Sequence, residues 1–341
     1  MLPEQVKPKP KLFTKSSCMI KDRIVALSKD LFLAVAAADA LGVPVEFEDR
    51  DERRADPVRG MRGYGTFRQP AGTWSDDFAL VACTVESMIA AGPSKLDLQD
   101  LGNRFCNWYR YGYWAVNQVF DIGIATQMAL ERIEMGCDPY EAGGVKEFDN
   151  GNGALMRILP LLLHPLYQQA DSMQRQELVQ ELSSVTHRHS RSALACYLYL
   201  QFADQLLHGR SKQEAYAYLC EHGTEDLTQD LRREVPHFTQ VLSGQLQQLE
   251  EDAIDSSGYV LHTLTAALWC VLNHNSYADT VLAAVNLGFD TDTTAAVAGP
   301  LALLAEQQRS GIPVEWRHKL AKRAEIEDLA DRFITRMDWC R

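Results

Sequence analysis

The sequence contains no Cys-x-x-Cys pair and no closely spaced cysteine framework, although it has eight cysteines in 341 residues. Several of them, such as Cys83, Cys196 and Cys270, lie inside apolar runs of helical spacing. Scattered thiols in apolar runs are typical of reduced core residues in an intracellular protein, and they argue against a cysteine-based zinc site. We therefore expect no disulfide bonds and no bound zinc.

Long apolar stretches and an excess of basic residues are also absent. No segment is long and apolar enough to span a bilayer, and residues 1–21 lack the apolar centre of a signal peptide. The formal net charge of −12 argues against a nucleic-acid or anionic-membrane partner, because neutralising phosphates requires a basic surface. We expect a cytoplasmic protein with neither kind of partner.

Strand patterns with hairpin turns are nearly absent, whereas helical patterns run through most of the chain. Apolar residues recur at three- and four-residue spacing in 27–42, 76–92, 119–136, 154–166, 191–209, 259–273, 278–288 and 293–308. Parts of these segments are apolar nearly all round, which is typical of helices inside a multi-helix domain. We predict an all-α fold, a single multi-helix bundle, with the polar segment 210–257 at its periphery.

The first 28 residues differ in composition from the rest. They combine prolines at 3, 8 and 10 with five lysines on an otherwise acidic chain, so we predict an arm over 1–28 and one helical domain over 29–341. One interpretation is a loose terminus; the other is a segment that becomes ordered on an acidic partner, with Leu12 and Phe13 as apolar anchors.

Two acidic motifs stand directly before apolar helical runs, GTWSDDFAL (72–80) and NLGFDTDTTAAVAG (286–299). Each is consistent with ordinary helix capping, in which hydroxyls and carboxylates bind free backbone N–H groups. Each motif holds two carboxylates and a hydroxyl with no basic residue nearby in sequence, which is more than helix capping requires. The oxygen donors they offer are Ser75, Asp76, Asp77, Asp290, Asp292 and Thr293.

These donors are hard oxygen ligands with no histidine or thiolate among them, which favours Mg²⁺ or Mn²⁺. Four like charges in one pocket cannot all ionise without a cation, so we predict two bound divalent cations. Glycine loops at DNGNGALMR (149–157) and FDIG (120–123) can bring backbone N–H groups to a phosphate. Ordinary turns are the alternative for both loops.

Several motifs, in chain order, resemble the ADP-ribosylglycohydrolase family, in particular the branch of the dinitrogenase-reductase-activating glycohydrolase. They are DALGVPVEF (39–47), GTWSDDFAL (72–80), FDIGIAT (120–126), GNGALMRILP (151–160), THRHSRSALAC (186–196), SGYVLHTLTAALWC (257–270), AVNLGFDTDTTAAVAG (284–299) and GIPVEW (311–316). The resemblance runs from about Asp30 to Trp316. It implies an all-α orthogonal bundle, two divalent cations, and removal of ADP-ribose from modified side chains, often arginine.

The same resemblance implies a role for individual residues. The metal ligands fall on Ser75, Asp76, Asp77, Asp290, Asp292 and Thr293, and the catalytic positions fall on Glu46, Asp77 and Asp292. The positions that line the substrate cleft fall on Asp121, Gly123, Gly151, Asn152, Gly153, Ala154, His187 and Tyr259. Three departures stand out: Ser75 replaces the usual threonine, Phe78 a small residue, and Phe289 a common glycine.

We therefore expect a hydrolase that acts on an ADP-ribosylated protein, with arginine as the modified residue. The arm over 1–28 leads to a second hypothesis, in which it binds and blocks an ADP-ribosyltransferase, such as a toxin to which the protein confers immunity. The alternative is a catalytically weak relative that binds ADP-ribose or a partner without turnover.

Overall fold

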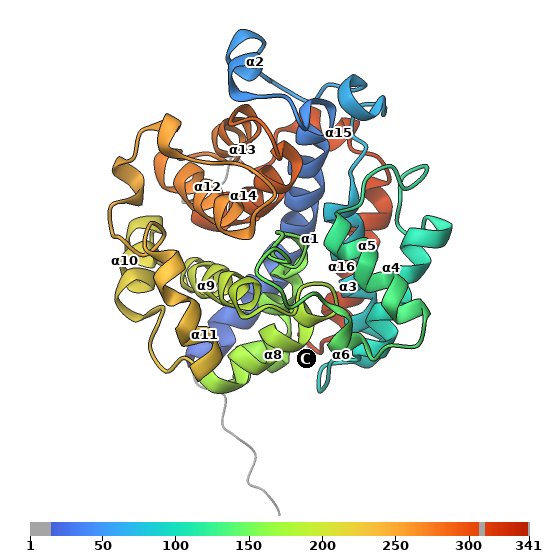
Figure 1. Cartoon of the computed structure of the whole chain (residues 1–341), viewed down its shortest axis with the longest axis vertical. Helices are drawn as coiled ribbons and strands as arrows, with labels where there is room; N and C mark the ends of the chain where they lie inside the picture. The colour runs from blue at the N-terminus through green and yellow to red at the C-terminus, as the bar shows by residue number, and fades with distance from the viewer. Residues whose placement is uncertain (1–14, 307–310, 340–341) are drawn as a thin grey trace, which may run out of the picture.

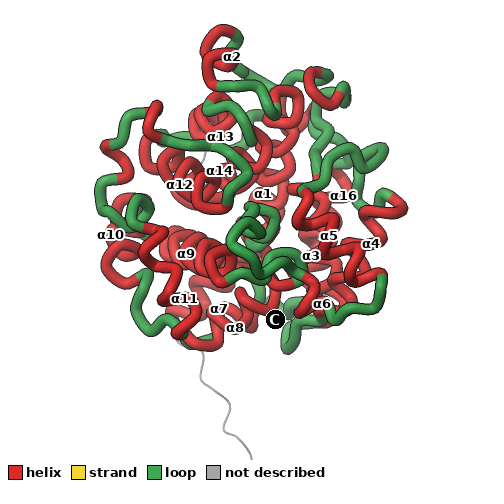
Figure 2. The backbone as a smooth tube through the Cα atoms, in the orientation of Figure 1, coloured by secondary structure: helices red, strands yellow, loops and turns green. Residues whose placement is uncertain are grey.

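The computed structural model describes residues 15–306 and 311–339, and within these residues it contains helices, loops and isolated bridges but no strand (Figures 1 and 2). The α-helices are α1 (Lys15–Gly42), α2 (Arg50–Ala55), α3 (Asp76–Ala91), α4 (Leu98–Tyr111), α5 (Ile124–Glu134), α6 (Pro139–Ala142), α7 (Pro165–Gln169), α8 (Ser172–Ser184), α9 (Ser190–Leu207), α10 (Lys212–His222), α11 (Gln229–Glu234), α12 (Val260–Asn273), α13 (Tyr277–Asn286), α14 (Thr291–Ala305), α15 (Val314–Lys319) and α16 (Arg323–Arg336). The predicted all-α bundle is confirmed.

The centre of the bundle is the pair formed by α1 and α14. Apolar residues bury the part of α1 from 31 to 41 on every side, and α1 also contacts α3 and α16. A Cβ on Gly42 would lie 2.3 Å from the Cα of Asp292, so only glycine allows the end of α1 to approach the start of α14 this closely. This contact places the second acidic motif against α1.

Two predicted helices differ from the structure. The segment 119–136 is helical only from Ile124, because 119–123 is a loop that ends at Gly123, the residue before α5. The segment 154–166 is divided between two 3₁₀-helices, Leu155–Arg157 and Leu159–Leu163, and the start of α7. Pro160 and Pro165 explain the second difference, since proline removes a helix hydrogen bond and clashes with the preceding turn.

The predicted end of the arm at residue 28 falls inside α1. Ile20, Ile24 and Leu27 are buried in the core, so residues from 20 onward pack with the domain. Residues 1–14, including Leu12 and Phe13, lie outside the described residues.

Peripheral elements cover one edge of the bundle. In Figure 1, α10 and α11 lie outside α9, as expected for the polar segment 210–257. Among the described residues, no helix combines the length and apolar character needed to cross a membrane.

Candidate active site

The two acidic motifs meet where α3 and α14 begin. Ser75 is the N-cap of α3, and its Oγ accepts a hydrogen bond from the backbone N–H of Asp77 at 3.3 Å. The hydroxyls of Ser75 and Thr293 both donate to Oδ2 of Asp77, each at 3.2 Å, across 216 residues of sequence in the second case. The helix starts therefore combine their oxygen ligands in one buried place.

Several carboxylate oxygens in this place are buried without a hydrogen-bond partner. They are Oε2 of Glu46, Oδ1 of Asp77, Oδ1 of Asp290 and Oδ2 of Asp292. A buried carboxylate oxygen that lacks a donor is costly, and a bound cation is one way to satisfy it. Oxygens from Asp39, Asp77 and Asp292 lie within 4.8 Å of one another, and so do oxygens from Glu46, Asp121 and Asp292.

Burial and mutual repulsion raise the pKa of these acids. For Asp76, Asp77 and Asp292, burial is the largest cause, and neighbouring carboxylates add to it. The pKa of Asp121 rises to about 6, again chiefly through burial. Such a cluster cannot carry all its negative charges without cations. Two overlapping groups of oxygens that share Asp292 therefore fit a pair of divalent cations.

Asp39 is a buried acid of the cluster that the sequence prediction did not select. It lies in α1, is fully buried, and accepts hydrogen bonds from the backbone N–H groups of Ser75 at 2.9 and 3.1 Å and of Phe78 at 3.0 Å. These bonds hold the first acidic motif against α1. Burial raises the pKa of Asp39 to about 7 against the opposing effect of its hydrogen bonds.

The glycine loop lies beside the acidic cluster. The side-chain amide of Asn152 donates to Oδ2 of Asp290 at 2.8 Å and to Oγ1 of Thr263 at 2.9 Å. A Cβ on Gly153 would come within 2.8 Å of Cε1 of His187, so glycine is needed there. The next residue, Ala154, is fully buried. The loop can thus offer backbone N–H groups next to the cluster.

His187 is buried behind this loop. Its Nδ1 lies 2.9 Å from Oγ1 of Thr186, which also accepts a hydrogen bond from Nη2 of Arg157 at 2.8 Å. Burial, and then the charge of Arg157, lower the pKa of His187 to about 3. The imidazole is therefore neutral near pH 7 and can serve as a hydrogen-bond partner but not as a cation.

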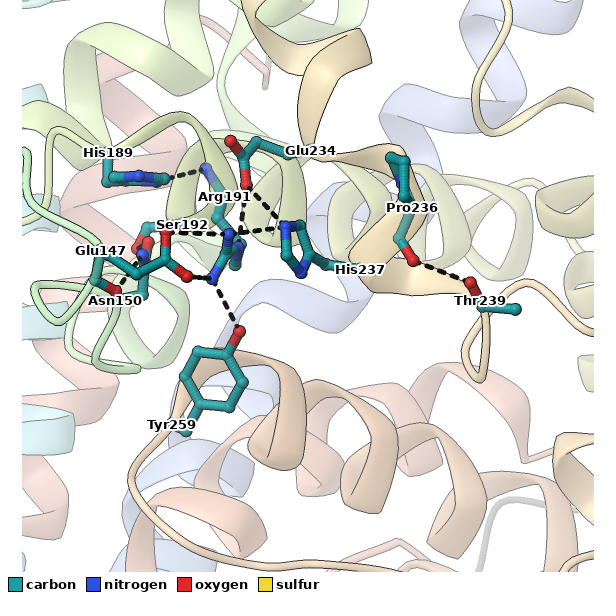
Figure 3. A network of polar contacts seen from close by, with 10 residues as sticks. All are labelled: Glu147, Asn150, His189, Arg191, Ser192, Glu234, Pro236, His237, Thr239 and Tyr259. Carbon is teal, nitrogen blue, oxygen red and sulfur yellow. Dashed lines mark hydrogen bonds and ion pairs between the residues drawn. The ribbon is translucent and has the colours of Figure 1, made fainter.

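A second residue that the prediction did not select, Arg191, joins Tyr259 to Glu147, two residues before the glycine loop (Figure 3). Its guanidinium donates to the Tyr259 hydroxyl at 3.1 Å, to Oε1 of Glu147 at 2.6 Å and to Oε2 of Glu234 at 2.8 Å. It also lies 2.8 Å from Nε2 of His237. Because its side chain is only 4% exposed, these contacts fix the loop and Tyr259 relative to α9.

The backbone supports the same connection. The N–H of Val260 donates to the carbonyl of Asn150 at 3.0 Å, and the N–H of Asn152 donates to the carbonyl of Gly258 at 3.1 Å. Arg191 lies in the motif 186–196, but the sequence gave no reason to select this residue, because its partners are up to 68 residues away. Of the residues predicted to line the substrate cleft, Gly123 is exposed. It stands directly before α5, two positions after Asp121.

In the residues that the structure describes, the fold is all-helical, and a buried cluster of carboxylates that could hold divalent cations lies beside a glycine-rich loop. A family model described as ADP-ribosylglycohydrolase matches residues 20–341. The chain belongs to the ADP-ribosylglycohydrolase family and is a glycohydrolase of that class. The match extends to residue 20, ten residues before the point at which the motifs begin to resemble the family.

Similar proteins agree with this assignment. The ADP-ribosylarginine hydrolase Tri1 of Pseudomonas putida is 34% identical, with 98% of this chain and 85% of that protein covered. The ADP-ribosyl-[dinitrogen reductase] glycohydrolase of Rhodospirillum rubrum is 30% identical, with 87% and 90% covered. A solved ADP-ribosylglycohydrolase-related protein complex matches with a TM-score of 0.75 and 31% identity over 94% of this chain and 99% of that one.

Replacing Arg191 with methionine tests the connection in Figure 3. We expect about tenfold weaker binding of ADP-ribose and a loss of about 3 kcal/mol in the free energy of unfolding, since Glu234 would lose its buried partner. Calorimetric titration and urea unfolding measure the two effects. The matched control is Arg233→Met in the same region, whose side chain is 66% exposed. Equal affinities in parent and Arg191→Met would contradict the positioning role.

Proposed function

We propose that this protein is a divalent-cation-dependent hydrolase that releases ADP-ribose from modified arginine side chains. The observation that carries the proposal is the set of buried carboxylate oxygens without partners at the junction of α3 and α14. The names of the similar proteins, an ADP-ribosylarginine hydrolase and an ADP-ribosyl-[dinitrogen reductase] glycohydrolase, support arginine as the linkage.

The cations would be held by the residues that the sequence predicts, Ser75, Asp76, Asp77, Asp290, Asp292 and Thr293, of which Asp77 and Asp292 also belong to the two groups of clustered oxygens. Mg²⁺ or Mn²⁺ held there would supply positive charge for orienting ribose hydroxyls and for activating a water molecule. Thr293 and Ser75 orient Oδ2 of Asp77 by hydrogen bonds, and Asn152 orients Oδ2 of Asp290. The hydroxyls and the amide thus fix the direction in which the carboxylates present their remaining oxygens.

Glu46 is our candidate for the acid that assists departure of the arginine. It is buried, and burial followed by the charge of Asp292 raises its pKa well above the usual range. A carboxyl group that keeps its proton near pH 7 can donate it to the nitrogen of a leaving guanidine. Asp77 and Asp292 are the candidates for positioning the attacking water, while Asp121, Gly123, the loop 151–154, His187 and Tyr259 bind the ADP-ribose portion.

The direct test is release of ADP-ribose from an arginine-ADP-ribosylated protein, with Mg²⁺, with Mn²⁺ and with chelator. We expect release with at least one of the cations and none with chelator. A parent protein that binds ADP-ribose but releases none under any condition would instead support the catalytically weak relative. Chromatographic measurement of free ADP-ribose distinguishes these outcomes.

A finer proposal concerns the segment 1–28. Its lysines and prolines support binding to an acidic surface, and an ADP-ribosyltransferase, such as a toxin, is a partner whose product this enzyme would reverse. Residues 15–28 belong to α1, so the test deletes only 1–14. Equal affinity of the deleted and full chains for the transferase would contradict a docking and immunity role.

A further inference from the structure

Three phenylalanines stand directly beside acids of the site. Phe47 follows Glu46, Phe120 precedes Asp121, and Phe289 precedes Asp290. Phe47 is 66% exposed and Phe289 47% exposed, although the neighbouring Glu46 is buried. Large aromatic side chains normally bury most of their area, so exposure next to a buried charge cluster points to a binding surface.

The rings of Phe47, Phe67 and Phe120 form a connected group, and backbone hydrogen bonds join Phe289 to it. The ring of Phe67 lies 6.0 Å from that of Phe47 and 5.0 Å from that of Phe120, measured between centroids. The hydroxyl of Thr66 donates to the carbonyl of Glu46 at 2.8 Å, which fixes the segment carrying Phe67 beside Glu46. We call Phe47, Phe67, Phe120 and Phe289 the aromatic rim.

The backbone holds two rim residues in an unfavourable conformation. Phe47 has φ of 68° and Phe289 has φ of 59°, a left-handed region that bulky residues rarely adopt. Two hydrogen bonds of 2.7 Å join the segments, from the N–H of Phe47 to the carbonyl of Phe289 and from the N–H of Phe289 to the carbonyl of Glu48. The fold therefore maintains strain that keeps both side chains at the edge of the site.

The charges around the rim select the kind of ligand it can take. Oε2 of Glu46 is buried without a partner, and Glu46, Asp121 and Asp292 bring oxygens within 4.8 Å of one another. The negative faces of aromatic rings attract a cation and repel a phosphate, and a carboxyl group such as that of Glu46 can accept a hydrogen bond even while it keeps its proton. The diphosphate is therefore expected at the glycine loop, and a cationic group at the rim.

We propose that the aromatic rim is the subsite for the guanidinium and alkyl chain of the arginine that carries ADP-ribose. The guanidinium stacks on the rings and donates an N–H to Glu46, while the alkyl chain packs on the exposed edges of Phe47 and Phe289. This inference rests on the proposed function, and it makes the rim a determinant of linkage, because a neutral serine side chain would gain neither interaction.

The test compares the parent with Phe47→Leu and Phe289→Gly. Leucine at 47 keeps an apolar side chain in the same left-handed backbone and removes only the ring, whereas glycine at 289 also removes the backbone strain. We expect the KM for ADP-ribosylarginine to rise about five- to thirtyfold, with the Kd of free ADP-ribose within twofold of the parent value. Tyr111→Leu is the control, since Tyr111 is 83% exposed at the end of α4.

The outcomes separate the subsite from the reaction. If the parent and Phe47→Leu have the same KM, the subsite is overturned while the proposed hydrolysis stands. If Phe47→Leu loses as much affinity for free ADP-ribose as it gains in KM, the subsite is also overturned, because the rim then binds the nucleotide. If the parent shows no turnover, the Kd of intact ADP-ribosylarginine replaces KM. If the subsite exists, the parent binds ADP-ribosylarginine more tightly than ADP-ribose. The difference between these two affinities is then smaller in Phe47→Leu than in the parent.

Discussion

Replacing Asp292 with asparagine is expected to lower the rate of ADP-ribose release about a thousandfold. Asp292 supplies an oxygen to both groups of clustered acids, so its loss removes an anionic ligand from each of two cation positions. A bound cation contributes several kcal/mol to a reaction of this kind, and each 1.36 kcal/mol is a factor of ten in rate. Asparagine keeps the size of the side chain, so the change is mainly one of charge.

Stability measurements distinguish this effect from misfolding. In chelator, the thermal midpoint of Asp292→Asn is expected to lie above that of the parent, because the substitution removes one charge from a repulsive cluster. Asp51→Asn is a matched control, since the Asp51 side chain is 91% exposed in α2. Retention of more than a tenth of the parent rate by Asp292→Asn would contradict the assigned site.

The metal-free protein is expected to lose stability as pH rises from 5 to 7.5. The pKa of Asp39 is raised to about 7 and that of Asp121 to about 6, both mainly by burial, while the unfolded chain ionises near pH 4. A raised folded-state pKa gives stability that is complete below the unfolded pKa and lost as pH approaches the folded pKa. The two groups together contribute a loss of about 4 kcal/mol over this range.

Saturating Mn²⁺ or Mg²⁺ should reverse the trend. Cations favour the ionised carboxylates and compete less with protons at higher pH, so the cation-induced rise in thermal midpoint should be larger at pH 7.5 than at pH 5. Thermal scans with chelator and with cation at both pH values measure this difference. A midpoint in chelator that is independent of pH would show that burial does not raise the pKa of these acids in the folded protein.

The sequence predicted the helices with clear three-and-four spacing and the pairing of the two acidic motifs. The helices and each acidic motif depend on short-range patterns, such as Asp76 and Asp77 before an apolar run, whereas the meeting of the two motifs across 216 residues was inferred from their shared chemistry. The break in 154–166 was also visible, because Pro160 and Pro165 interrupt the pattern, but the apolar periodicity outweighed them in the prediction.

Other parts of the site could not be read from local patterns. Asp39 acts through backbone groups 36 and 39 residues away, and Arg191 binds partners in three separate segments. An aspartate in a helix or an arginine at a helix start commonly faces solvent, and only the tertiary fold buries these two. The aromatic rim is similar, since Phe47, Phe67 and Phe120 form one surface only after their loops meet.

The central place of α1 has a consequence for synthesis on the ribosome. The hydroxyl of Thr291, the first residue of α14, binds the carbonyl of Gly42 across 249 residues. At about 5–20 residues per second, α1 emerges roughly 12–50 s before the helix that covers it. During that interval its apolar surface has no native partner from α14 or α16, so the nascent chain is expected to depend on chaperones until its last helices are made.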